Sequence, residues 1–218
     1  TGFITGGFRP TNSNTENWIG QVYLYRENED IPIDDNGKAM LPLLQICLEG
    51  LPYIPDALKG SKVLTIFVSE NMPGRLAYNG DAWVIREYKE EDVLVVKDIY
   101  MQSSSRIKPY PLKSQLITED YPVWDSGDIP MDIEDELVEM EDSGEITDYY
   151  DYTDCFAGHK IGGYPNYIQS GIDFGDGYEF MIQIASDEKA NLNIIDSGNF
   201  YLAKNSQTGD WRLYCDFY

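Results

Sequence analysis

The runs PLLQICL (42–48) and KVLTIFV (62–68) decide the fold class of this chain. Both are short and rich in aliphatic or β-branched residues, and turn-forming residues lie near their ends, which is typical of buried strands. Five further runs share this pattern: AWVIREY (82–88), EDVLVVKDIYM (91–101), YEFMIQI (178–184), GNFYLAK (198–204) and DWRLYCDFY (210–218). Because parallel strands need crossovers of about a dozen residues or more, the short spacing of the runs predicts antiparallel sheets. The sequence therefore predicts a mainly β fold, of the α+β type, with few short helices.

The strongest helix candidate is IPMDIEDELVEMEDSG (129–144). Its apolar residues Ile133 and Leu137 recur with helical spacing and fall on one face. Asp128 is a candidate N-cap, and acidic residues in the first turns suit the positive end of the helix dipole. A second, shorter helix is predicted in YIPDALKG (53–60).

Two pairs of segments echo each other along the chain. The pairs are ITGGFRP (4–10) with IGGYP (161–165), and PLLQI (42–46) with FMIQI (180–184). This self-similarity predicts two pseudo-repeated β units, about 1–70 and 156–218, packed as one body in a single domain over 1–218. Chance similarity between β-rich segments is the alternative interpretation.

Net charge limits the partners of this protein. The chain of 218 residues has a formal net charge of −22 and a pI near 4.1. Its field repels nucleic acids and anionic membrane surfaces, and attracts a basic protein. The simpler interpretation is that the charge reflects only solubility or an acidic cytosol.

Localisation follows from hydropathy and cysteine use. The chain has no run of about 18 apolar residues that would span a membrane. Its 3 cysteines are an odd number and widely spaced, so they do not form a disulfide framework. We therefore expect a reducing, cytoplasmic location.

Acidic residues concentrate in a central segment, about 119–154. Between Lys113 and Lys160 the sequence has no Lys or Arg, and its last part, EITDYYDYTD (145–154), interleaves acid with tyrosine. Exposed tyrosines are typical anchors of protein interfaces. We predict that a partner is contacted by Glu134, Glu136, Glu139, Asp142, Asp148, Tyr149, Tyr150, Asp151, Tyr152 and Asp154. The alternative is a solvated linker or helix face.

The only histidine, His159, lies in the stretch FAGHKIGGYPNYIQ (156–169). Cys155 is close in sequence, but the neighbouring glycines argue against a helix that would bring thiol and imidazole together. A Gly-Gly pair before Tyr and Pro indicates a tight turn with positive φ rather than a phosphate loop. Gln45 and Gln183, each inside an apolar strand, are predicted to bond the Gly-Gly corners.

No catalytic, cofactor-binding or metal-ligating residue is predicted. The acidic clusters DDNGK (34–38) and DFGDG (173–177) lack the ligand spacing of an EF-hand and are predicted to be turns. We therefore do not expect an enzyme or a cofactor.

Several long segments carry a resemblance to a known family. They are WIGQVYL (18–24), NGKAMLPLLQICLEGLPYIPDAL (36–58), KVLTIFVSE (62–70), HKIGGYPNYIQ (159–169), FMIQIASDEKANLNIIDSGNFYLAKN (180–205) and WRLYCDFY (211–218). Together they resemble the YwqG-like family of bacterial proteins over most of the chain, apart from about residues 70–150. The family commonly has a Trp-Gly-Asp-like stretch where this chain has Ile194-Ile195-Asp196-Ser197-Gly198, so no role is carried over for that Trp or Gly.

The resemblance implies a mainly β fold with an internal duplication and no established enzymatic activity. Members are often encoded beside polymorphic toxins, which implies a role as an immunity protein in bacterial competition. The first hypothesis is therefore a protein that binds and neutralises a cognate basic toxin, of a kind that includes nucleotide- or nucleic-acid-directed toxins.

The second hypothesis is an enzyme or small-molecule binder. Its pocket would lie between the two β units and be lined by His159, Gln169, Gln183 and Asp196. A general cytosolic scaffold is the third possibility, and it predicts no single tight partner.

Overall fold

The protein is mainly β, as the sequence predicts. A computed structural model describes residues 1–218 except 12, 14, 75, 81 and 100–105. Strands account for 33% of the residues and helices for 11%. The strands are β1 (Gly2–Thr5), β2 (Asn17–Ile19), β3 (Leu24–Tyr25), β4 (Leu41–Cys47), β5 (Ser61–Val68), β6 (Ala77–Tyr78), β7 (Trp83–Lys89), β8 (Val95–Val96), β9 (Tyr110–Gln115), β10 (Lys160–Ile161), β11 (Tyr178–Ala185), β12 (Asn199–Asn205) and β13 (Trp211–Asp216).

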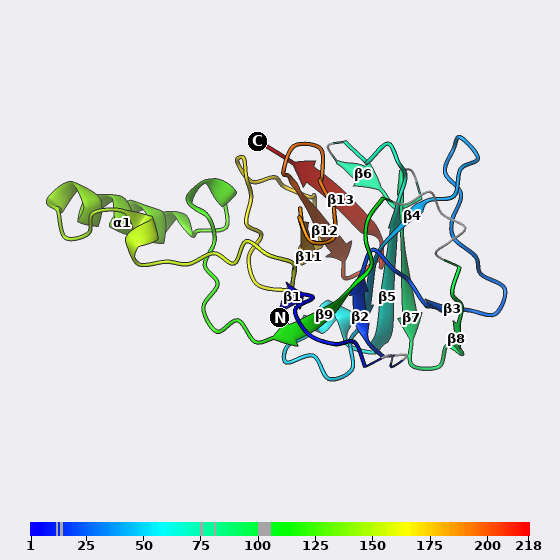
Figure 1. Ribbon diagram of the computed structural model, residues 1–218. Helices are drawn as coiled ribbons and strands as arrows, with labels where there is room; N and C mark the ends of the chain where they lie inside the picture. Colours follow the sequence, from blue (N-terminus) through cyan, green and yellow to red (C-terminus); the bar gives the residue numbers. More distant parts are fainter. Residues whose placement is uncertain (12, 14, 75, 81, 100–105) are drawn as a thin grey trace.

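All but two of these strands form one antiparallel sheet. Its order is β6-β13-β12-β11-β10-β1-β9-β2-β4-β5-β7, and β3 pairs with β8 separately. The strands β6 and β7, which follow each other in sequence, lie at the two ends of this order. The sheet therefore curls until its ends approach one another, and β11–β13 face β4, β5 and β7 across the core (Figure 1).

The same pairing pattern occurs on both sides of the central pair β1 and β9. On one side β2, β4, β5 and β7 are neighbours in that order, and on the other side β10, β11, β12 and β13 are. Trp83 begins β7 and Trp211 begins β13, and both indoles belong to the main core. The two halves thus bury their apolar faces against each other, which is why β4 and β12 are buried along their whole length.

Two glutamines occupy matching positions in these halves. Gln45 lies opposite Trp18 of β2, and Gln183 lies opposite Lys160 of β10. Each side chain bonds the backbone on either side of the short partner strand, as detailed below for Gln183. The prediction that Gln45 bonds the Gly6-Gly7 corner is wrong, because its amide bonds Glu16, Tyr23 and Leu24 instead.

The long helix is found close to its predicted place. α1 covers Met131–Ser143 and ends at Gly144, which is left-handed with φ 76°. Asp128 does not cap it, since Pro130 is the N-cap and no side chain bonds the first turn. The predicted helix at 53–60 is only a short 3-10 turn, η1 (Asp56–Leu58).

The predicted strand at 91–101 is paired only at β8, and its last residues lie outside the described part of the chain. Two more 3-10 turns, η3 (Trp124–Ser126) and η4 (Tyr149–Asp151), flank α1. Within the described ranges, no helix has the length and hydropathy needed to cross a bilayer.

Candidate functional site

The acidic segment 119–154, hereafter the acidic arm, leaves the sheet after β9 and returns before β10. Its helix α1 projects away from the body, at the left of Figure 1. No residue of α1 is buried, and Met131, Ile133 and Val138 are 78%, 44% and 43% exposed. An isolated helix with apolar side chains in solvent is unusual in a monomer, and such exposure marks interaction surfaces.

The base of the arm is ordered by aromatic packing and hydrogen bonds. The ring of Tyr149 packs against Trp124 and Tyr150 at centroid distances of 5.3 and 5.2 Å. Its hydroxyl donates to the carbonyl of Pro122 at 2.8 Å, and the Tyr150 hydroxyl accepts from the Trp124 N–H at 3.0 Å. Val123 anchors the base in a cluster on the β12 face. The arm is thus fixed at its root and free at its tip.

Most of the predicted contact residues are at the surface, with one correction. Tyr149 is only 6% exposed, because its ring and hydroxyl are used inside the arm, so it is not an exposed anchor for a partner. Asp148 is exposed and also caps η4 by accepting from the Tyr150 N–H at 2.8 Å. Glu134 is half-buried. The other predicted contact residues are exposed: Glu136, Glu139, Asp142, Tyr150, Asp151, Tyr152 and Asp154.

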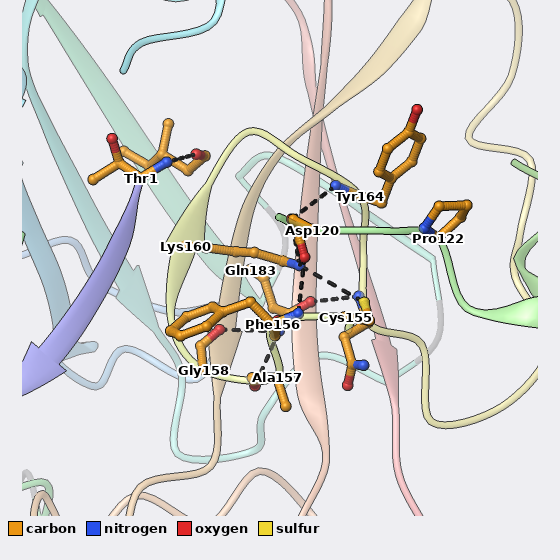
Figure 2. A network of polar contacts seen from close by, with 12 residues as sticks. Thr1, Asp120, Pro122, Cys155, Phe156, Ala157, Gly158, Lys160, Tyr164 and Gln183 are labelled. Carbon is orange, nitrogen blue, oxygen red and sulfur yellow. Dashed lines mark hydrogen bonds and ion pairs between the residues drawn. The ribbon is translucent and has the colours of Figure 1, made fainter. Parts of the chain in front are cut away.

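A buried ion pair holds the start of the arm to the sheet (Figure 2). The Lys160 ammonium lies 2.9 and 3.0 Å from the two carboxylate oxygens of Asp120, and the lysine side chain is 2% exposed. The same carboxylate accepts from the N–H groups of Phe156 at 2.8 Å and Tyr164 at 3.2 Å. A buried charge needs this full set of partners. Gly163 is required beside it, because a Cβ there would collide with the Asp120 carboxylate.

Cys155 lies on the other side of the lysine, with its Sγ 4.0 Å from Lys160 Nζ. Burial raises the pKa of this thiol, and the neighbouring ammonium only partly opposes the shift. The thiol is therefore neutral at physiological pH, which does not favour a reactive cysteine. No sequence motif predicts the pairing of Asp120 with Lys160. The only signal for it is the lysine that follows a long segment without Lys or Arg.

Gln183 completes the turn beside this ion pair (Figure 2). Its Oε1 accepts from the Asn166 N–H at 2.7 Å, and its Nε2 donates to the carbonyls of Ala157 and Gly158 at 3.1 and 3.0 Å. The side chain is fully buried. These bonds are structural, but the prediction that Gln183 bonds the Gly162-Gly163 corner is wrong, because its partners lie on either side of that corner.

His159 is buried, and both ring nitrogens are engaged. Nδ1 accepts from the Ala185 N–H at 3.1 Å, so the neutral ring carries its proton on Nε2, 3.2 Å from the Asp187 carboxylate. Burial alone would raise the pKa of Asp187, but the His159 hydrogen bond and further donors hold it well below its usual range. The imidazole thus joins β10 to the end of β11, as the prediction of a structural histidine requires.

The four residues of the predicted alternative pocket do not meet in one site. His159 and Gln183 are buried in separate bonding networks, whereas Gln169 and Asp196 are exposed. Gln169 Nε2 donates to the carbonyl of Phe217 at 2.7 Å. The set was chosen from side-chain chemistry along the sequence, which does not report the direction of each side chain.

A hollow does lie between the two halves, with other residues around it. It has a volume of about 530 Å³ and is lined by Leu41, Glu70, Met72, Arg106, Asn191 and Asn193, among others. Asn191 has a positive φ of 51°, an uncommon backbone state for a residue with a side chain. In the described part of the chain, no three His, Cys, Asp or Glu side chains gather where they could hold a metal ion.

Comparison with sequence families identifies the chain. A profile described as a domain of unknown function, DUF1963, matches residues 19–207. The chain therefore belongs to the DUF1963 family. A search of curated proteins found no match.

Proposed function

We propose that this DUF1963 protein is a binding protein of the YwqG-like kind, an immunity protein that neutralises a cognate basic toxin domain by direct contact. The exposed part of the acidic arm is the contact surface, with Tyr150 and Tyr152 among its anchors and Glu136, Glu139, Asp142, Asp148, Asp151 and Asp154 supplying charge. The protein acts in the cytoplasm of the cell that it protects. Nucleotide- and nucleic-acid-directed toxins fit as partners because their substrate clefts are basic.

One observation carries this proposal: the arm projects into solvent with its charges uncompensated. Among the described residues, Asp120 is the only acid of the arm with a Lys, Arg or His nitrogen within 4.0 Å. Like charges held together on one helix repel each other and cost stability. A basic partner removes this repulsion on binding and is steered towards the arm during approach.

A matched pair of charge variants tests the proposal. The arm variant combines Glu136→Gln, Glu139→Gln, Asp142→Asn and Asp151→Asn. The body variant combines Asp35→Asn, Glu49→Gln, Glu90→Gln and Glu91→Gln, which are exposed residues in turns outside the arm. Both variants lose the same number of negative charges, so an effect of net charge alone reduces partner capture equally in both.

Each variant is used to capture proteins from the native cells, and bound proteins are identified and quantified by mass spectrometry. We expect one stoichiometric basic partner with wild type and the body variant, and at least tenfold less of it with the arm variant. Equal capture by the two variants would refute the arm as the contact surface. Protection of cells against the captured protein then tests the immunity role.

The hollow between the halves supports a second candidate, small-molecule binding. Its volume of about 530 Å³ lies within the range of ligand pockets. Arg106 and Glu70 give it opposite charges for a polar ligand. A ligand screen by thermal shift on wild type and Arg106→Gln separates this candidate from the first, because a ligand in this hollow stabilises wild type and not the variant.

A further inference from the structure

The acidic arm contains an apolar hollow of its own. It has a volume of about 360 Å³ and is lined by Leu137, Met140, Ile146, Tyr149, Tyr152 and Glu145, among others. Leu137 and Met140 come from the inner face of α1, and the others come from the chain that returns towards the sheet. Five of these six side chains present mainly apolar surface.

The hollow is built by the way α1 ends. Gly144 is left-handed, so the chain reverses and the N–H groups of Glu145 and Ile146 donate to the Met140 carbonyl at 2.9 and 3.3 Å. This reversal brings Ile146 back beside Met140. Tyr149 is fixed by its hydroxyl bond to the Pro122 carbonyl and closes the hollow towards the sheet. Because both ends are held by hydrogen bonds, the hollow is present before any partner arrives.

Acidic groups surround this apolar opening. Glu145 lines it directly, and Glu141 accepts from the Tyr149 N–H through its Oε1 at 3.0 Å. Asp148 and Asp151 are exposed neighbours in sequence of Tyr149 and Tyr152. A partner that offered only an apolar group would leave these carboxylates without a cation, whereas a partner that offered only a basic group would leave the hollow unfilled.

We infer that the hollow receives one apolar side chain from a basic segment of the partner, with Lys or Arg residues on either side of it. The apolar side chain anchors the segment, and the flanking cations meet the acidic rim. Central apolar anchors inside a polar rim carry most of the binding energy of many interfaces. This inference rests on the proposed function, since it assigns the partner's chemistry at the same arm.

A peptide pair tests the inference without any variant. One short synthetic peptide carries a single Leu between two Lys-Arg pairs, and its partner peptide has Ser in place of that Leu. Binding to the full chain is measured by fluorescence anisotropy at low salt. We expect the Leu peptide to bind about tenfold more tightly, because its side chain is removed from water.

Methyl NMR locates the peptide. With methionine methyl groups labelled by carbon-13, the Met140 signal shifts on addition of the Leu peptide and shifts less with the Ser peptide. Met131, which is 78% exposed at the other end of α1, and the buried Met40 are internal controls that stay in place. Equal affinities for the two peptides, binding of neither, or an unmoved Met140 signal would overturn the inference.

Two variants on adjacent helix positions complete the test. Leu137→Glu puts a charge into the hollow, and Val138→Glu puts the same charge on the exposed outer face. Leu137→Glu should reduce Leu-peptide affinity to the Ser-peptide level, and Val138→Glu should not. If capture of the cellular partner is reduced by the arm variant but not by Leu137→Glu, the inference about the hollow is refuted and the proposed function stands. If the arm charges have no effect on capture, the proposed function itself fails.

Discussion

At the scale of single residues, the stretch around His159 is a junction and not a reactive centre. The imidazole, Gln183 and the Lys160–Asp120 pair each bond different segments to β10 or β11. The polar groups of these side chains are hydrogen-bonded or ion-paired within the fold. In the sequence, a lone histidine beside a Gly-Gly pair resembles an active site. In the structure, the two glycines are explained by their positive φ angles and by close approach to a carboxylate.

The Lys160–Asp120 pair supports a stability prediction. Lys160→Met leaves a half-buried carboxylate with two backbone donors and no cation, and should lower the free energy of unfolding by about 3 kcal/mol. Lys59→Met is the control, because Lys59 and Asp56 are 70% and 91% exposed and such exposed pairs contribute little to stability. Urea unfolding of both variants checks this. Equal losses in the two variants would contradict a special role for the buried pair.

At the scale of elements, apolar runs predicted most of the long strands and missed the central ones. β4, β5, β7, β11, β12 and β13 lie within two residues of their predicted bounds, because a buried strand must be apolar along most of its length. The central strands β1, β2, β9 and β10 were not predicted. β1, β2 and β10 are short, and β9 (Tyr110–Gln115) has six residues but few apolar ones, and the pairing of these strands is set by neighbours distant in sequence. Periodicity over a few residues carries too little information to find them.

The acidic arm was predictable as a charged segment with a helix, but its shape was not. Charge and spacing in the sequence indicate α1 and its exposed acids. That Tyr149 turns inward, and that the returning chain forms a hollow against α1, depends on the reversal at Gly144 and on the contact with Trp124. These are tertiary contacts that no local pattern encodes.

The arm's helix should be separable from the fold. Replacing residues 131–143 by a flexible Gly-Ser linker removes no buried side chain, so the thermal unfolding midpoint should change by less than about 2 °C. Leu44→Ala, in the main core, should instead cost about 3 kcal/mol. Calorimetry of the linker variant and of Leu44→Ala measures the two effects. A large loss on helix replacement would mean that α1 supports the body.

At the scale of the whole molecule, the matching halves suggest duplication. We propose that units of about 2–89 and 110–216 descend from one β unit and exchange their first strands, because β1 pairs with β10 and β9 pairs with β2. The corresponding residues Gly20 and Gly162 both have positive φ, 73° and 68°. Their N–H groups donate to the carbonyls of Leu43 and Met181. These limits differ from the units of about 1–70 and 156–218 expected from the sequence echoes, which matched the Gly162 corner with Gly6 and not with Gly20.

Duplication predicts equal roles for the two glutamines. Gln45→Ala and Gln183→Ala each leave buried backbone groups without partners, at a cost of about 2–4 kcal/mol in the free energy of unfolding. Chemical denaturation of the two variants gives the comparison. Costs that differ by more than about twofold would argue against equivalent positions.

Glu87 links the halves and gives a pH prediction. Burial alone would raise its pKa, but hydrogen bonds from Lys204, Lys89 and Ser61 lower the pKa to about 2. Glu87 therefore stabilises the fold above its unfolded pKa of about 4.5, and this contribution is lost as pH falls towards 2. The difference in unfolding free energy between wild type and Glu87→Gln should shrink between pH 7 and pH 3. A constant difference would contradict the assignment.

The central claim is that the exposed acids of the arm steer and hold a basic partner. The most direct measurement is the association rate constant of the captured partner with wild type, the arm variant and the body variant across ionic strength. We expect fast, strongly salt-dependent association for wild type and the body variant, and slower association with a weaker salt dependence for the arm variant. Identical rates and salt dependence for the two variants would contradict it.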